Sequence, residues 1–186
     1  RRFYAGTVAG EVGDFDLVVA RPDTAPDRFL KPDVVAPIVA AVPGVRAVAP
    51  RIHAVVAVKS PDKDGDKPFV ALDPAIDDFG EVKITTGVYD LGAGDDGLPG
   101  TVVLQETADV LDLQVGDPVE ITYTPPVSRV KGRLPAANGS HRSARATWVV
   151  RGIGTQRGVT GQDSNEGVIV GLAAVVVWRH HGNIAR

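Results

Sequence analysis

The stretch from which the fold is best predicted is residues 101–121, TVVLQETADVLDLQVGDPVEI. The run 101–104 is apolar and rich in valine, which is typical of a buried strand. Residues 106–111 predict a short helix, because Ala108 and Leu111 share one helical face at i, i+3 spacing. Residues 119–124 alternate apolar and polar side chains, which predicts a half-buried strand. We therefore expect a strand, a short helix, a turn and a second strand.

The turn inside this stretch is Leu113-Gln-Val-Gly-Asp117. Gly116 suits a tight turn with positive φ, since glycine has no Cβ to clash there. The Asp117 carboxylate can accept a hydrogen bond from the backbone beside it. A Val-Gly-Asp turn alone is a weak signal, because several small β-barrel families use it. The helix and strand that precede it make the whole stretch more specific.

The rest of the chain mixes strands and helices without regular alternation. We expect further strands at 16–20, 54–59, 69–72, 146–153 and 168–170, and helices at 34–42 and 172–181. Pro37 is expected in the first turn of its helix, where a missing N–H costs little. Pro43 and Gly44 should end that helix. No repeat recurs at a fixed period, and the mixture favours an α+β fold over a doubly wound sheet.

Composition excludes several classes of protein. The chain has 186 residues with 44% hydrophobic and 23% charged residues, which fits one domain or two small ones. The net charge of -3 argues against nucleic acid as the main partner. Cysteine is absent, so neither a disulfide nor a thiolate site can form. Methionine is absent even at position 1, which predicts a fragment or a processed product. No apolar run approaches the ~18 residues that span a bilayer.

The motifs of common enzymes and cofactor sites are missing. There is no Gly-x-Ser-x-Gly elbow and no phosphate-binding glycine loop, although Gly152-Ile-Gly154 resembles a fragment of one. The alternating carboxylates of Asp62, Asp64 and Asp66 suggest a calcium loop, but Lys67 replaces the glycine that its sharp turn needs. A solvated hairpin tip is the favoured interpretation. We predict no catalytic residue, no metal site and no cofactor.

One electrostatic feature stands out. No Asp or Glu occurs between residues 121 and 162. The basic residues of that stretch are Arg129, Lys131, Arg133, Arg142, Arg145, Arg151 and Arg157. One interpretation is a basic hairpin that faces the acidic 62–96 region of the same domain. The other is a surface for an anionic lipid headgroup, a cell-envelope polymer or a partner protein. The candidate binding residues are Arg129, Lys131, Arg133, Arg142 and Arg145.

The stretch 101–121 resembles the MacB-like periplasmic core domain of FtsX-type ABC transporter permeases, in which a strand precedes a short helix, a Leu-x-Val-Gly-Asp turn and a second strand. The order of parts around it is also similar. Residues 42–51, VPGVRAVAPR, look like the family's passage from a helix through Pro-Gly-Val into a strand. Further similar stretches lie at 16–19, 70–74, 84–87 (expected as a loop), 149–153 and 168–172. The loop 125–146 departs from the family by being longer and more basic.

The resemblance implies a divided α+β fold with two lobes. A membrane-proximal split βαβ-like, porter-type lobe would take residues 14–60 and 166–186, and an inserted mixed α/β lobe would take 68–160. Residues 16–20 would share the first lobe with 168–181, and both termini would lie at one end of the molecule.

The resemblance also implies a function. The whole chain, 1–186, would be the extracytoplasmic domain of a membrane-bound permease, not an enzyme. It would couple ATP hydrolysis by a cytoplasmic ATP-binding subunit to substrate export or to action on an envelope partner. The expected partners are that subunit, an envelope protein or a lipid-like substrate, and a second permease copy in a dimer, with no nucleic acid. The alternative is a stand-alone secreted module that binds the cell envelope without catalysis.

Overall fold

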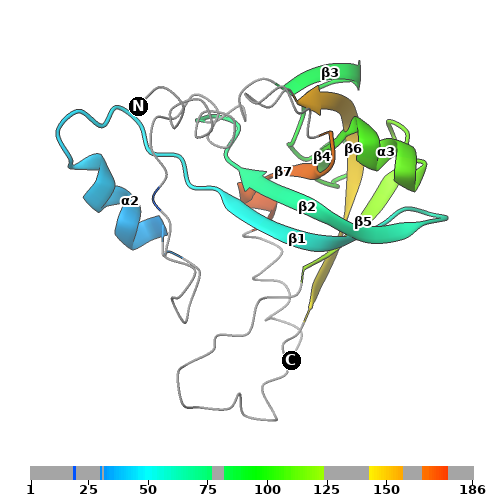
Figure 1. The fold of residues 1–186 in the computed structure, drawn as a ribbon, viewed down its shortest axis with the longest axis horizontal. Helices are drawn as coiled ribbons and strands as arrows, with labels where there is room; N and C mark the ends of the chain where they lie inside the picture. The colour runs from blue at the N-terminus through cyan, green and yellow to red at the C-terminus, as the bar shows by residue number, and fades with distance from the viewer. Residues whose placement is uncertain are drawn as a thin grey trace, which may run out of the picture.

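The computed structural model describes residues 19, 30, 32–76, 82–123, 143–156 and 165–175. Its regular elements are α2 (Pro32–Ala40), β1 (Ile52–Lys59), β2 (Asp64–Leu72), β3 (Val82–Gly87), β4 (Gly100–Leu104), α3 (Gln105–Leu111), β5 (Pro118–Tyr123), β6 (Ala144–Gln156) and β7 (Val168–Gly171) (Figure 1). Residues 172–175 add one turn of helix after β7. The described part of the chain is thus a strand-rich α+β fold.

The strands form one seven-stranded sheet in the order β3-β6-β4-β7-β2-β1-β5, and β5 pairs in addition with β6. That additional pairing closes every strand except β3 into a ring, which is a small barrel. Two neighbouring pairs, β2 with β7 and β4 with β6, are parallel, whereas the other pairs are antiparallel. Closure gives each ring strand a neighbour on both sides, although β5 covers only residues 57–59 of β1 and β7 only residues 69–72 of β2.

The barrel interior holds the main hydrophobic core. Trp148 of β6 is fully buried there, beside Val150 of the same strand and Ile121 of β5. From β2, Phe69 and Ala71 face this core, in keeping with the two-residue period of a strand. Leu111 of α3 belongs to the same cluster, so the short helix packs over the barrel and contributes to its interior.

A second core covers part of the barrel's outer surface. Val70, Val102 and Ile169 point outward from β2, β4 and β7 and form a cluster with Leu91. The segment around β3 supplies partly buried side chains to this cluster, among them Ile84. Every residue of β4 and β7 is consequently buried. Burial on both faces explains why these two strands are continuous apolar runs rather than alternating ones.

The stretch 101–121 folds as its sequence predicts. Strand β4 leads directly into α3, and β5 follows the turn. Gly116 adopts φ 99°, and its N–H donates to the carbonyl of Val150 at 2.8 Å. The Asp117 carboxylate accepts the Gln114 N–H at 2.8 Å, as expected for a turn-capping aspartate. The turn therefore hydrogen-bonds to β6 and continues the ladder beyond β5.

Two elements differ from the sequence-based expectation. Helix α2 begins at Pro32, so Pro37 lies inside the helix rather than in its first turn. Residues 84–87, expected as a loop, belong to strand β3 and pair with β6. Their register with β6 depends on residues about 70 positions further along the chain, and local sequence does not encode such pairing. The expected strand at 16–20 apart from residue 19, most of the helix 172–181 and both termini lie outside the described residues.

The sheet also bears on the expected division into lobes. Strands β1 and β7 were expected in the membrane-proximal lobe. Strands β4 and β5, and most of β2, were expected in the inserted lobe. All five are hydrogen-bonded members of the same ring. The described residues therefore form a barrel that joins both sets of strands, and a separate porter-type lobe stays a prediction.

Gly152 of β6 lets the backbone at Val88, just after β3, approach β6 closely. The N–H of Val88 donates to the carbonyl of Arg151 at 2.9 Å, which holds the strand end after β3 against β6. A Cβ at Gly152 would collide with the carbonyl oxygen of Val88. The glycine pair at 152 and 154 thus serves strand packing in β6, not a phosphate-binding loop.

We predict that Gly152→Ala lowers the free energy of unfolding by about 1–3 kcal/mol, because a backbone atom must move to admit the methyl group. The matched control is Gly65→Ala in β2, where the nearest side-chain atom would lie 3.8 Å away. That variant should be neutral or slightly stabilising. Urea denaturation of the two variants measures the difference, and equal midpoints would contradict the close approach.

Candidate functional site

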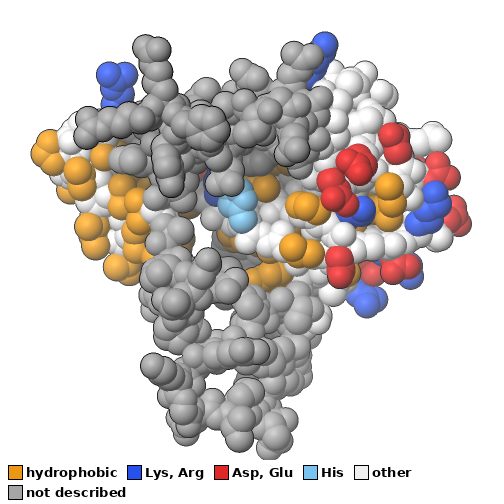
Figure 2. Space-filling view, in the orientation of Figure 1, with side chains coloured by type: hydrophobic (Ala, Val, Ile, Leu, Met, Phe, Trp, Pro, Cys, Tyr) orange, Lys and Arg blue, Asp and Glu red, His pale blue; other side chains and the backbone are white. Residues whose placement is uncertain are grey.

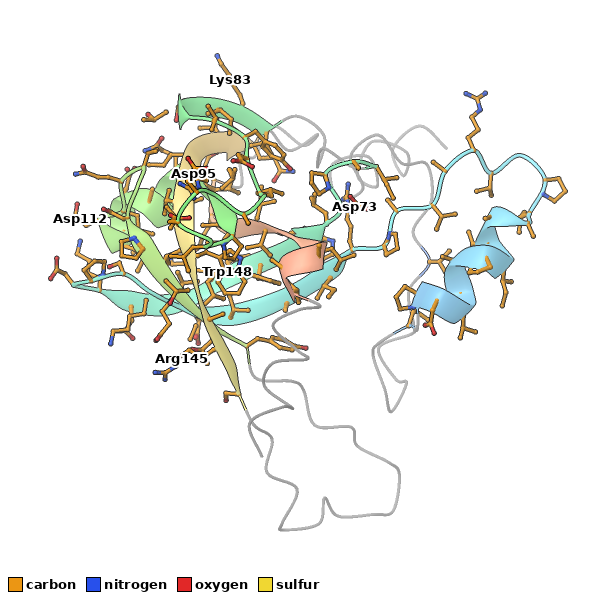
Figure 3. All side chains as sticks on the ribbon, turned by 180° about the vertical axis from the view of Figure 1, so that it is seen from behind. Asp73, Lys83, Asp95, Asp112, Arg145 and Trp148 are labelled. Atoms are coloured by element: carbon orange, nitrogen blue, oxygen red, sulfur yellow. The ribbon has the colours of Figure 1, made fainter. Side chains whose placement is uncertain are left out.

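In the sequence, four of the predicted binding residues fall between β5 and β6, and the fifth, Arg145, is the second residue of β6. Strands β5 and β6 pair from Pro118 opposite Val149 to Tyr123 opposite Ala144. This ladder brings together the two ends of the segment that carries Arg129, Lys131, Arg133 and Arg142. Those four residues lie outside the described residues. Arg145 is the one candidate that the structure places, near the free end of the ladder (Figure 3).

Arg145 is exposed and weakly paired. Its Nε lies 3.5 Å from Oε1 of Glu120 on the neighbouring strand β5. The side chains are 67% and 32% exposed, respectively. An ion pair this open contributes about 0–1 kcal/mol, since water and salt screen it. The guanidinium of Arg145 can therefore exchange Glu120 for another anion at little cost.

Arg151, on the same strand, has a different environment. Its Nη2 donates to Oδ1 of Asp96 at 2.9 Å, and the guanidinium lies against Gly94, where a Cβ would collide with it. The side chain of Arg151 is only 24% exposed. This pair joins the basic stretch to the acidic 62–96 region, as the hairpin interpretation expects, whereas Arg145 pairs with Glu120 outside that region. Arg151 is thus a structural residue of the barrel.

Lys67 makes an ion pair that sequence reasoning missed. Its Nζ donates to Oε1 of Glu166 at 2.6 Å, and its side chain is 9% exposed against 40% for Glu166. The sequence did contain a signal for this ion pair, because the two-residue period puts Lys67 on the same inward face of β2 as Phe69 and Ala71. A buried lysine on an apolar strand face needs a charged or hydrogen-bonding partner.

The segment just before β7 is held by several further contacts. The Gly167 N–H donates to Oγ1 of Thr107 in α3 at 2.8 Å, and the carbonyl of Gly167 accepts the Leu104 N–H. The carbonyl of Asn165 accepts the Glu106 N–H at 2.8 Å. Together with the Lys67–Glu166 pair, these bonds fix residues 165–167 between β2 and α3. They position β7 for its place in the ring.

The candidate calcium loop is a hairpin turn between β1 and β2. Asp62, Asp64 and Asp66 are all exposed, and Asp64 pairs with Lys59 in the ladder. The buried hydroxyl of Ser60 donates to the carbonyl of Lys63 and accepts the Lys63 N–H, which closes the turn. Within the described ranges, no three acidic or histidine side chains gather as metal ligands would.

Hydropathy gives one further finding. No helix among the described residues is both long and apolar enough to cross a bilayer.

Comparison with known proteins gives weak structural similarity and no match in sequence. No protein-family model matches the chain, and no curated protein matches it in sequence. Among solved structures, it is similar to a domain of a protein assigned as a permease from Porphyromonas gingivalis. The TM-score is 0.41 with 14% identity, over 74% of this chain and 55% of that chain.

This neighbour is of the permease type expected from the sequence, at that coarse level only. This chain spans about half the length of the matched one.

We predict that Glu166→Gln destabilises the protein more than Lys67→Met does. The first change leaves a buried ammonium without its counter-ion, which costs about 3 kcal/mol for a buried pair and less here, because Glu166 is 40% exposed. The second removes the charge, keeps the apolar stem and leaves Glu166 in contact with water. Chemical denaturation of both variants measures the order, and a larger loss for Lys67→Met would refute it.

Proposed function

We propose that this chain is the extracytoplasmic domain of an ABC transporter permease of the FtsX/MacB type. In this role it has no catalytic residues and no cofactor. It couples ATP hydrolysis by a cytoplasmic ATP-binding subunit to substrate export or to action on an envelope partner. The permease acts as a dimer, and its membrane helices belong to a longer protein.

The observation that carries the proposal is the unit from β4 to β5. Its strand, seven-residue helix, glycine turn and second strand follow the pattern that the sequence shares with this family. The unit is central to the barrel, because β4 pairs with β6 and β7 while β5 pairs with β1 and β6. A closed ring of strands is expected to move as a rigid body, which suits a domain that transmits motion.

The proposed two-lobe arrangement adds a porter-type lobe to this barrel. Residues 14–51 and the chain after β7 would supply it. The strand pairing places the start of β1 and the end of β7 at the same level of the barrel, because Ile52 pairs with Ala71 and Ala71 pairs with Val170. The chain thus enters β1 and leaves β7 at one end of the barrel, where adjacent strands lie about 5 Å apart.

The proposed binding surface is the basic connection between β5 and β6. Arg129, Lys131, Arg133, Arg142 and Arg145 would attract an anionic envelope partner or a lipid-like substrate. Their contribution is faster encounter rather than tight binding, because exposed charges act over a Debye length of only ~8 Å at physiological ionic strength.

The permease proposal predicts an association in membranes. When the complete natural protein is purified from membranes in mild detergent, an ATP-binding protein should co-purify, and its ATPase activity should depend on the permease. The isolated 186-residue chain should show no saturable ATP binding by calorimetry. A complete protein that has no membrane segments and is secreted would instead support the stand-alone envelope-binding module.

The basic residues give a separate prediction. Replacing all five with serine in the complete protein should slow transport or partner association, and the wild-type rate should approach the variant's as salt rises. Arg145→Ser alone should change the free energy of unfolding by less than about 1 kcal/mol, so misfolding would not explain the loss. Unchanged rates at both low and high salt would show that the stretch is only a structural hairpin.

A further inference from the structure

The segment that precedes β7 caps the N-terminus of helix α3. Leu104 stands at the N-cap position of α3 and makes no side-chain capping hydrogen bond. The first N–H groups of a helix have no partner within the helix, so they must find one outside it. The carbonyl of Gly167 accepts the Leu104 N–H at 2.9 Å. The carbonyl of Asn165 accepts the Glu106 N–H at 2.8 Å, so α3 depends on a segment far from it in sequence.

The same segment is also held by two buried side chains. Nζ of Lys67 in β2 donates to Oε1 of Glu166 at 2.6 Å. Oγ1 of Thr107, which is fully buried in α3, accepts the Gly167 N–H at 2.8 Å. We call residues 165–167 the clasp, because they bind β2 and α3 at once and continue directly into β7.

Strand β7 connects the clasp to the opposite side of the barrel. Its four residues are all buried and span about 13 Å. The chain leaves β7 at the level where β1 begins. Figure 1 shows this exit on the α2 side of the barrel, with α3 on the opposite side. A displacement of the chain after β7 therefore acts along a short, enclosed strand whose other end is bonded to α3.

Helix α3 is short enough to respond to such a displacement. It has seven residues, and isolated helices below about 12–15 residues are marginal in water. Ala108 and Leu111 pack into the main core, whereas Glu106 and Asp109 are exposed. Figure 2 shows charged side chains of both signs gathered over this end of the molecule, away from α2. Loss of the cap would loosen the first turn of α3 and so alter an exposed, charged surface.

We propose that the clasp couples β7 to α3, so that a displacement of the chain that leaves β7 is passed on to α3. The source of the displacement, a membrane helix further along the complete protein, rests on the proposed function, whereas the coupling itself belongs to the barrel. Proteins open locally in cooperative units, and β7, the clasp and α3 form one such unit. Coupling is reciprocal, so loosening either end of the unit must loosen the other.

The test measures hydrogen–deuterium exchange of the full 186-residue chain by mass spectrometry, in two variants that each break one ion pair. Glu166→Gln removes the counter-ion of Lys67 and loosens the clasp from β2. The matched control, Asp96→Asn, breaks the pair with Arg151, and the two carboxylate side chains are 40% and 41% exposed. Exchange in residues 104–111 should rise at least about fivefold in Glu166→Gln and less than about twofold in Asp96→Asn, because only the former acts on the cap of α3.

Reciprocity supplies a second measurement from the α3 side. Thr107→Val leaves the buried Gly167 N–H without an acceptor and should speed exchange in residues 167–171 at least about fivefold. Thr107→Ser keeps the hydroxyl and should exchange like the wild type.

The coupling would be overturned if Glu166→Gln sped exchange equally in all peptides or in β2 alone. A Thr107→Val variant that loosened α3 but not β7 would also overturn it. If Thr107→Val did not fold, the comparison of Glu166→Gln with Asp96→Asn would still decide. None of these results bears on co-purification with an ATP-binding protein, so the permease proposal is tested independently.

Discussion

The structure depends on the pairing of β6 along both of its edges. This strand has 13 residues, and no other single strand is long enough to cover it. Strand β5 pairs with its first half and β3 with its second half, while β4 occupies the opposite edge. The turn at Gly116 and Asp117 bridges the gap between β5 and β3 by hydrogen bonds to Val150. Without this shared edge the ring would not close, and Trp148 would lose the interior that surrounds it.

An irregularity in β6 connects this ladder to the charged residues. The register with β4 shifts between Thr101 and Val102, so Arg151 is skipped in the pairing. Trp148 and Val150 point inward before the shift, and Ile153 points inward after it. The extra residue makes Ile153, rather than Gly152, the next inward side chain of β6. Arg151 lies on the outer face, as its alternation with Val150 predicts, and pairs there with Asp96 of the glycine-rich segment that follows β3.

The charged and apolar groups of the surface are separated along the barrel. Two cations are paired structurally, Lys67 with Glu166 and Arg151 with Asp96. Arg145 stays exposed beside Glu120 at the end of the β5–β6 ladder. The turn after β1 carries exposed carboxylates and exposed lysines, and α2 lies at the far end of the molecule. Three surfaces of different chemistry thus leave one rigid barrel in different directions.

Local sequence is enough to identify most of the individual strands, the short helix and the glycine turn. Periodicity and turn chemistry gave the helix at 105–111, the glycine turn at 116 and the strands from β4 to β7 within a few residues, because these features depend on neighbouring residues. It also predicted a polar hairpin tip at 61–68, which is shorter in the structure because β2 already begins at Asp64. Tertiary structure alone decided the closure of the ring, the parallel pairing of β2 with β7, the strand at 82–87 and the Lys67–Glu166 pair. The partners in that ion pair are 99 residues apart. Side-chain periodicity specifies which face of a strand is buried, but not which strand lies beside it. For the same reason the sequence identified the basic candidates, while only the structure distinguished the open Arg145 from the enclosed Arg151.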